Sequence, residues 1–255
     1  MFDIEFFKDW KTINGIFHNP NDKYIGNCIS SGGVWEYYLH PYLKTNKLGD
    51  ILDIGANIGC HSIYMAEQNP DKTIHCFEPQ QYQFFALNTN IINKKLYNVK
   101  TYQLALGSKK DTARFPNCYS TPGYKNFGGA SLIPNYHGVD DSGKYHPEIE
   151  GHDHILKTKV LSELPVENSG EIVNIVTLDS LQIPKVSLMK VDVEGYEQEF
   201  LQGAKQTILR DKPDIIIEIH KDLNEMETKL TLKELGYHIE HIPNAPVWDY
   251  FCKAK

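Results

Sequence analysis

The sequence lacks the features of disulfide-rich, zinc-binding and membrane-spanning proteins. Its five cysteines are scattered, odd in number and never spaced as CxxC, so neither a disulfide framework nor a structural zinc site is expected. No apolar stretch approaches the roughly 20 residues that cross a bilayer. The N-terminal MFDIEFFKDWK has acidic residues where a signal peptide has a basic start. These absences predict a protein without a membrane span, located in the reducing cytoplasm.

The chain also has no block of lysines and arginines. It carries 26 Lys and Arg against 33 Asp and Glu, a formal charge of −7, so an extended nucleic-acid surface is not expected. Its 255 residues, 41% of them hydrophobic, are enough for one large core. We therefore predict a single domain over residues 1–255.

Segments of strand and helix character alternate along most of the sequence. Short apolar runs predict strands, and apolar residues at helical spacing predict helices. The expected strands begin with 51–55, 73–79 and 99–106, and continue with a run from Leu188, 214–220 and a final antiparallel pair in 237–242 and 247–255. The expected helices are 60–68, 82–95, 198–209 and 222–235. This alternation predicts an α/β fold, with a mostly parallel sheet covered by helices on both faces.

Two regions depart from the alternation. Residues 1–49 are expected to form a helical cover, in which the stretch 32–40 would be a helix over the ligand site. Glu36, in this stretch, could contact a ligand bound beneath the cover. The preferred interpretation is that it only packs against the rest of the fold. Residues 111–169 are rich in Gly, Pro, Asn, Ser, Tyr and His, which is typical of a lid or insertion. Within them we expect short strands at TARF and GASLI, a hinge at Gly128–Gly129, and histidines in solvated loops.

The stretch DIGANIG (53–59) follows the first expected strand and opens a helix. Glycines at such a turn let the backbone approach a ligand, and the helix N-terminus offers unpaired N–H groups. A dinucleotide fold would show GxGxxG here, whereas this turn has the spacing D-x-G-x-x-x-G. Asp53 would repel a pyrophosphate, but it suits the ammonium group of an amino acid. His61, just after the turn, is expected on the helix surface.

The second expected strand ends in an acid, Glu78, about 20 residues beyond the glycine turn. A carboxylate in this place accepts hydrogen bonds from both hydroxyls of a ribose. A turn that favours an amino acid, beside a strand that favours a ribose, predicts S-adenosylmethionine as the cofactor. The expected cofactor residues are Asp53, Gly55, Asn57, Gly59, Glu78, Leu104 and Ala105.

These segments, taken in order, resemble the FkbM family of S-adenosylmethionine-dependent methyltransferases. The resemblance covers about residues 50–240 and is carried by DIGANIG, FEP, GGASL (128–132), TLDSL (177–181), LMKVDVEGYEQEFLQGA (188–204), DIIIEIH and LGY (235–237). It implies a Rossmann-like sheet of seven strands and transfer of a methyl group, usually to oxygen, often on sugar or polyketide hydroxyls. Family members commonly have a shorter link between the third strand and TLDSL, so the extra residues here could reshape the acceptor pocket.

Charged residues recur at every second position of LMKVDVEGYE, where Lys190, Asp192 and Glu194 would share one face of a strand. Charges on a core strand are costly unless they are paired, exposed at its end or used. Glu218 and His220 end the neighbouring expected strand in the same way. Ligands in such sheets lie at the carboxyl ends of the strands, so Asp192, Glu194, Glu218 and His220 are the candidate catalytic residues. A purely structural role, such as pairing with a carboxylate, is preferred for Lys190 and Glu197.

Three roles remain open for these four polar groups. His220 suits a general base that takes the proton of an acceptor hydroxyl, with a carboxylate to orient it. Alternatively, Asp192, Glu218 and His220, together with Glu194, would hold Mg²⁺ or Mn²⁺. The third role is hydrogen bonding to the acceptor alone. In the structural alternative, Glu194 would instead cap the following helix.

We therefore predict an O-methyltransferase that acts on a carbohydrate hydroxyl of a glycan or glycoconjugate. The alternatives are another acceptor (a lipid, a polyketide or an amine) and a non-catalytic module that binds the cofactor. A dehydrogenase is disfavoured because the dinucleotide glycine pattern is missing.

Overall fold

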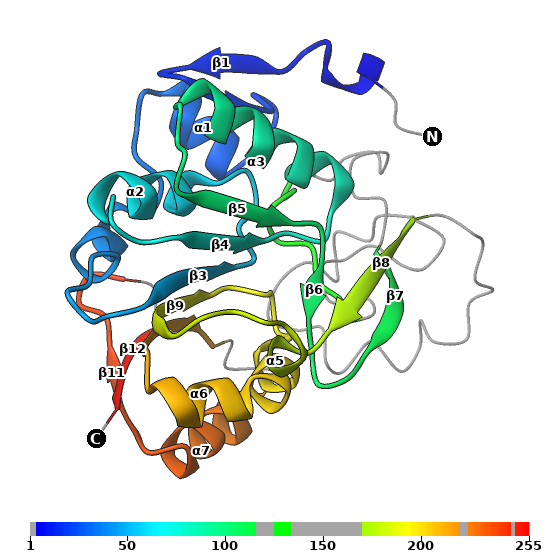
Figure 1. Ribbon diagram of the computed structural model, residues 1–255. Helices are drawn as coiled ribbons and strands as arrows, with labels where there is room; N and C mark the ends of the chain where they lie inside the picture. Colours follow the sequence, from blue (N-terminus) through cyan, green and yellow to red (C-terminus); the bar gives the residue numbers. More distant parts are fainter. Residues whose placement is uncertain (1–3, 116–124, 134–169, 220–223, 246–247, 255) are drawn as a thin grey trace.

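The central feature of the fold is a sheet with the strand order β11-β12-β10-β9-β3-β4-β5 (Figure 1). It was obtained from a computed structural model that describes residues 4–115, 125–133, 170–219, 224–245 and 248–254. Its strands are β3 (Asp50–Ile54), β4 (Ile74–Phe77), β5 (Val99–Tyr102), β9 (Val186–Val191), β10 (Asp214–Glu218), β11 (Tyr237–His241) and β12 (Asp249–Ala254).

The directions of the strands confirm the predicted α/β sheet. β10, β9, β3, β4 and β5 are parallel neighbours, and β12 runs antiparallel to both β10 and β11. The chain goes outward from β3 to β5, then returns to β9 on the other side of β3. The connections therefore reverse direction between β3 and β9, which is where sheets of this kind bind ligands.

Helices cover both faces of the sheet (Figure 1). One face packs against α2 (Cys60–Gln68) and α3 (Gln81–Asn93), and the other against α5 (Glu197–Gly203), α6 (Lys205–Asp211) and α7 (Glu225–Glu234). Neighbouring residues of one strand face opposite layers, because side chains alternate across a sheet. Ile51 packs with α2 and α3, and Leu52 packs with the layer of α5 to α7.

A second, smaller sheet corrects the expectation of one strand over 99–106. β5 ends at Tyr102, and β6 (Ala105–Leu106) pairs instead with β8 (Glu171–Val176), which also pairs with β7 (Asp111–Phe115). The helix expected over 198–209 is likewise divided, because α5 ends at Gly203. A Cβ at Gly203 would lie 1.9 Å from the carbonyl oxygen of Gly107, so α5 ends where it meets the backbone that follows β6.

The GASLI stretch is irregular, although a strand was expected there. It belongs to residues 125–133, which we call the strap.

The N-terminal segment, residues 4–49, is helical only in part, which corrects the expected helical cover. It contains a hairpin of β1 (Lys11–Ile13) and β2 (Ile16–His18), then α1 (Ile25–Ser30) and two 3₁₀ helices at Ile4–Phe7 and Tyr37–Tyr42. The hairpin turns at Asn14–Gly15, with φ of 52° and 80°. Asn-Gly is the pair that favours such turns. The stretch 32–40 is thus a turn followed by a 3₁₀ helix.

None of the helices in the described part of the chain has both the length and the apolarity that crossing a bilayer requires.

Gly55 is required by packing, and its substitution should be costly. It has a φ of 80°, and a Cβ would lie 1.7 Å from the carbonyl oxygen of Asp192. We expect Gly55→Ala to reduce the free energy of unfolding by more than the roughly 1–2 kcal/mol of a left-handed residue, measured by urea denaturation. Gly32→Ala is the control, since Gly32 has a φ of 77° with no atom within 4 Å of the added Cβ. Equal losses for the two variants would contradict the role of the Asp192 contact.

Candidate active site

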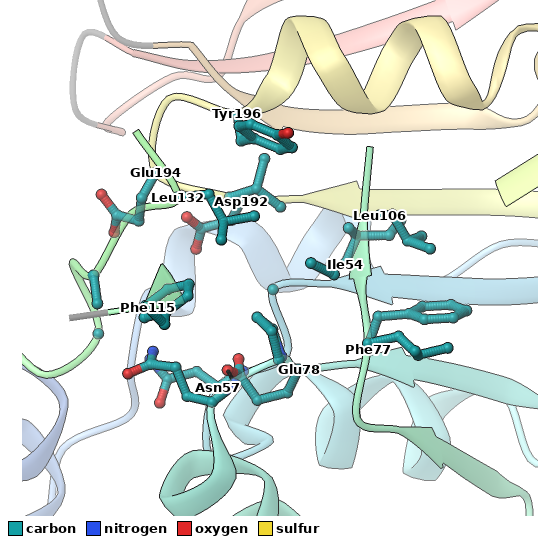
Figure 2. A pocket seen from close by; sticks show the side chains of 18 residues that line it. Ile54, Asn57, Phe77, Glu78, Leu106, Phe115, Leu132, Asp192, Glu194 and Tyr196 are labelled. Carbon is teal, nitrogen blue, oxygen red and sulfur yellow. Dashed lines mark hydrogen bonds between the residues drawn. The ribbon is translucent and has the colours of Figure 1, made fainter. Parts of the chain in front are cut away.

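A pocket of about 560 Å³ lies at the carboxyl ends of β3, β4 and β9, where the chain connections reverse (Figure 2). Its wall combines the turn after β3, the end of β4, β6, the strap, and the residues that follow β9. Five predicted cofactor residues line it: Gly55, Asn57, Glu78, Leu104 and Ala105.

Glu78 holds two parts of this wall together. Its Oε2 accepts a hydrogen bond from the backbone N–H of Asn57 at 2.9 Å, and its Oε1 accepts one from that of Gln80 at 2.8 Å. An ionised carboxylate has about four lone-pair positions, so each oxygen keeps one for a ligand donor. This capacity matches the two hydroxyls of a ribose. Leu104, Ala105 and Leu106, together with Phe77, give the pocket an apolar side.

Asp53 and Gly59, the other two predicted cofactor residues, lie behind the pocket wall. The carboxylate of Asp53 is fully buried and accepts a 2.5 Å hydrogen bond from Ser62 Oγ. It is therefore not placed for the direct contact with a cofactor ammonium that the spacing predicts. Gly59 has a φ of 90°, which favours glycine, and a Cβ there would lie 2.6 Å from Leu87 Cδ1. Both residues support the turn from the protein side.

Lys190 connects the turn after β3 to the end of β9. Its Nζ lies 2.9 Å from Asp192 Oδ2 and 3.9 Å from Asp53 Oδ1. Burial acts to lower the pKa of Lys190, but the nearby carboxylates of Asp192 and Asp53 outweigh it and raise the pKa above its ordinary value. The lysine is thus a buried cation paired with carboxylates, as the sequence predicted.

Asp192, Glu194 and Glu218 form a cluster that we call the acidic edge. Each offers an oxygen that lies within 4.8 Å of one from each of the others. Figure 2 shows Asp192 and Glu194 across the pocket from Asn57 and Glu78. The structure thus brings together three of the four predicted catalytic residues, while His220 and the insertion histidines lie outside the described residues.

The three carboxyl groups differ in their affinity for protons. Burial acts to raise the pKa of Asp192, but the Lys190 ammonium and a hydrogen bond from Glu218 outweigh it and lower the pKa to about 2. Burial and the Asp192 charge raise the pKa of Glu218 and of Glu194 well above the ordinary value. Asp192 therefore stays ionised, and its neighbours retain protons more readily.

Glu194 occupies an unusual backbone conformation, with a φ of 51°. Such residues are strained and persist where their surroundings fix them. Ser131 Oγ donates a hydrogen bond to the Glu194 carbonyl at 2.5 Å, and Glu197 Oε1 accepts one from the N–H of Gly195 at 2.9 Å. Glu197 thus fixes the turn, in agreement with its predicted structural role.

Glu36 of the N-terminal segment does not line the pocket, in agreement with the preferred interpretation that it packs against the fold. Glu36 Oε2 lies 3.2 Å from His61 Nε2. The expectation of a surface His61 is wrong, since its exposed fraction is 5%. Burial, together with the charge of Asp192, raises the pKa of Glu36 to about 8. Burial, together with the charge of Lys190, lowers that of His61 to about 3. Near neutral pH both groups are therefore mainly uncharged.

Tyr38 and Asp249 form a further contact beside the acidic edge, which no sequence pattern indicates. Tyr38 Oη donates a hydrogen bond to Asp249 Oδ2 at 3.2 Å. Asp249 opens β12 and stands opposite Glu218 in the register of β10 and β12. Tyr38 lies 211 positions before Asp249 in the chain. At such a separation the spacing of residues in the sequence does not predict a contact.

A seven-stranded sheet that is parallel except for β12, with a glycine turn after β3 and an acidic residue after β4, is the architecture of the class I methyltransferases. The family described as "Methyltransferase FkbM domain" matches residues 53–239. The chain therefore belongs to the FkbM family of methyltransferases, and it is an S-adenosylmethionine-dependent enzyme.

Relatives of this chain carry methyltransferase names. It is 27% identical over 188 residues to "Methyltransferase 1" of Beauveria bassiana, covering 72% of this chain and 70% of that protein. It is 22% identical to the "31-O-demethyl-FK506 methyltransferase FkbM" of Streptomyces tacrolimicus, with the same coverage. The fold is similar to a crystal structure of methyltransferase FkbM from Methylobacillus flagellatus, with a TM-score of 0.51 and 13% identity. That match covers 80% of this chain and 43% of the longer chain.

Removing the Lys190 ammonium should leave two carboxylates without their cation. We expect Lys190→Met to lower the free energy of unfolding by about 3–5 kcal/mol, measured by urea denaturation, and Asp53→Asn in the same chain to restore part of it. Lys72→Met is the control, because buried Lys72 donates its hydrogen bonds to backbone carbonyls of Lys47 and Gly49. A loss for Lys190→Met no greater than that for Lys72→Met would refute the ion-pair role.

Cofactor affinity should depend on the protonation of Glu78. Burial raises its pKa to about 8, although two backbone N–H groups oppose this. Ribose hydroxyls donate to the ionised form, so binding should lower the pKa and release a proton. Affinity should therefore weaken as pH falls below 8, by at most about tenfold per pH unit.

Calorimetric titration with S-adenosylmethionine near pH 7, in buffers of different ionisation enthalpy, should detect the release of close to one proton. Glu78→Gln should lose this release and bind about tenfold or more weakly. Glu171→Gln is the control, because Glu171 accepts bonds from Gln81 N–H outside the pocket lining. Proton release that persists in Glu78→Gln would assign the effect to another group.

Proposed function

We propose that this enzyme methylates a hydroxyl group of a carbohydrate, with the acidic edge facing the acceptor. The observation that carries the proposal is the position of Asp192 and Glu194, two members of the acidic edge, across the pocket from Glu78 and Asn57 (Figure 2). With the ribose at Glu78 and the amino-acid part near Gly55, the transferable methyl group would point toward Asp192. Methyl transfer needs the nucleophile in line with the breaking bond, and the acidic edge could hold it there.

The carboxyl groups support an acceptor that donates several hydrogen bonds. Ionised carboxylates only accept hydrogen bonds, and Asp192 remains ionised over the physiological range because its pKa is about 2. A sugar offers neighbouring hydroxyl groups that could be shared between Asp192 and Glu218.

A base must accept the proton of the acceptor hydroxyl as the bond between its oxygen and the methyl carbon forms. Asp192 is a weak base because Lys190 stabilises its charge, so we assign it to orientation of the acceptor. Glu218 has a raised pKa, so in its ionised form it accepts a proton more readily than Asp192 does, and His220 remains the predicted base two positions beyond it. The predicted role of Mg²⁺ or Mn²⁺ stays a second proposal, supported by the three carboxylates of the acidic edge.

A non-sugar acceptor is the second candidate for the substrate. The relative from Streptomyces tacrolimicus is named for 31-O-demethyl-FK506. A hydroxyl group of a non-sugar acceptor, such as a polyketide, is therefore the second candidate beside a sugar hydroxyl. Both candidates share transfer to oxygen and differ in the number of donor groups that they present to the acidic edge.

Changing the acidic edge should lower turnover strongly. We expect Asp192→Asn and Glu218→Gln to lower kcat by about 100-fold to 10,000-fold. Glu218 lies outside the pocket lining, so Glu218→Gln should change S-adenosylmethionine affinity less than about threefold. Methyl transfer from labelled cofactor would be measured with panels of saccharides, lipids, polyketides and amines. Asp214→Asn is the control, because Asp214 begins the strand that Glu218 ends and pairs with Lys47 at 2.7 Å.

Several outcomes of this experiment are decisive. Turnover of a lipid, polyketide or amine with none on any saccharide would overturn the carbohydrate proposal. Wild-type kcat in Asp192→Asn and Glu218→Gln would remove the acidic edge from the chemistry. If EDTA abolished activity and Mg²⁺ or Mn²⁺ restored it, the metal proposal would be favoured over a general base.

A further inference from the structure

The strap forms one side of the cofactor pocket without belonging to any of the three sheets. Its residues Gly128, Ala130 and Leu132 line the pocket together with Asn57 and Glu78. It rests directly on the glycine turn, because a Cβ at Gly128 would lie 2.9 Å from Asn57 Nδ2. No strand occurs in residues 125–133, so contacts other than sheet pairing must hold the strap in place.

One end of the strap is clamped by Asp22 of the N-terminal segment. Its Oδ2 accepts a hydrogen bond from the N–H of Phe127 at 3.1 Å, and its Oδ1 accepts bonds from the N–H groups of Tyr24 and Gly26 at 2.9 and 3.0 Å. The carboxylate is 6% exposed. Charge-assisted bonds of this kind are stronger than neutral ones. Asp22 thus ties the strap to the start of α1.

Two more hydrogen bonds reinforce this clamp. The N–H of Lys23 donates to the carbonyl of Lys125 at 2.8 Å, and Gln83 Nε2 donates to the carbonyl of Phe127 at 3.1 Å. Phe127 itself packs with Phe115 and Val173 in a small apolar cluster. The strap is therefore held by the N-terminal segment, by α3 and by the second sheet.

The other end of the strap is tied to the acidic edge. Ser131 Oγ donates to the carbonyl of Glu194 at 2.5 Å and accepts from the N–H of Ile133 at 3.0 Å. Ser131 is buried, with an exposed fraction of 1%. Between Asp22 and Ser131, the strap spans the pocket from the N-terminal segment to the turn after β9.

We propose that the strap retains the bound cofactor, and that Asp22 and Ser131 are its positioning residues. Opening the pocket on this side requires the hydrogen bonds of the clamp and of Ser131 to break, so these bonds should set the rate at which cofactor leaves. Asp22 lies outside the residues matched by the family, 53–239. The N-terminal segment thus contributes to cofactor retention, independently of which acceptor is methylated.

The test is the kinetics of S-adenosylmethionine binding to the full chain, measured by stopped-flow fluorescence. We expect Asp22→Asn and Ser131→Ala each to raise koff about tenfold or more, with kon changed less than about threefold. Ser131→Thr keeps the hydroxyl and should restore koff to within about twofold of the wild-type value.

The control for general destabilisation is Asp179→Asn. Asp179 also accepts two backbone N–H bonds, from Gln206 and Thr207 at 2.8 Å, but it belongs to no part of the pocket lining. Its loss should lower stability and leave koff unchanged. Wild-type koff in both strap variants, or an equal change in Asp179→Asn, would overturn the proposal.

Hydrogen exchange gives a second readout that needs no variant. In the wild-type chain, S-adenosylhomocysteine should slow exchange of the Phe127 and Gly129 amides about tenfold or more, since the occupied pocket would hold the strap closed. Exchange at these amides that is unchanged by the ligand would overturn the proposal, even if Asp22→Asn does not fold.

Discussion

The buried ammonium of Lys190 is the interaction on which the site depends. It lies between Asp53 at the end of β3 and Asp192 after β9, and Asp53 and Lys190 are partners in the register of the two strands. A slip of one residue would turn these charges toward the opposite, apolar layer. The pairing therefore favours one register strongly, and that register places the glycine turn beside the acidic edge. The pocket exists because these two strand ends are held together.

Local patterns in the sequence predicted the framework well. Short apolar runs marked β3, β4 and β10, and helical spacing marked α2 and α3, because each element buries one face or both in the core. The division of 99–106 into β5 and β6 was missed, since it depends on pairing with β8 about 70 residues later. The pair Asn14–Gly15 favours a hairpin turn and could have predicted β1 and β2, but residues 1–49 were expected to be helical.

In the candidate site, too, the residues set by local sequence could be predicted, and those set by contacts between distant parts of the chain could not. The positions of Gly55, Asn57 and Glu78 at the pocket could be predicted, because a glycine turn and the end of a strand are both recognisable from a few neighbouring residues. Asp53 was identified as important, but its partner is Lys190 on the adjacent strand, so it supports the wall from behind. The links between Asp22 and Phe127 and between Tyr38 and Asp249 span 105 and 211 positions. Such contacts depend on the three-dimensional fold and cannot be predicted from the spacing of residues in the sequence.

The contact between Tyr38 and Asp249 also bears on the order in which the protein is made. The residues that line the cofactor pocket are complete once Tyr196 has been synthesised, whereas Tyr38 must wait for β12 to emerge. Pairings between distant parts of a chain form late because closing the long loop is entropically costly. The residues that line the pocket are therefore synthesised before Glu218, the last member of the acidic edge, and before Asp249, which lies beside it.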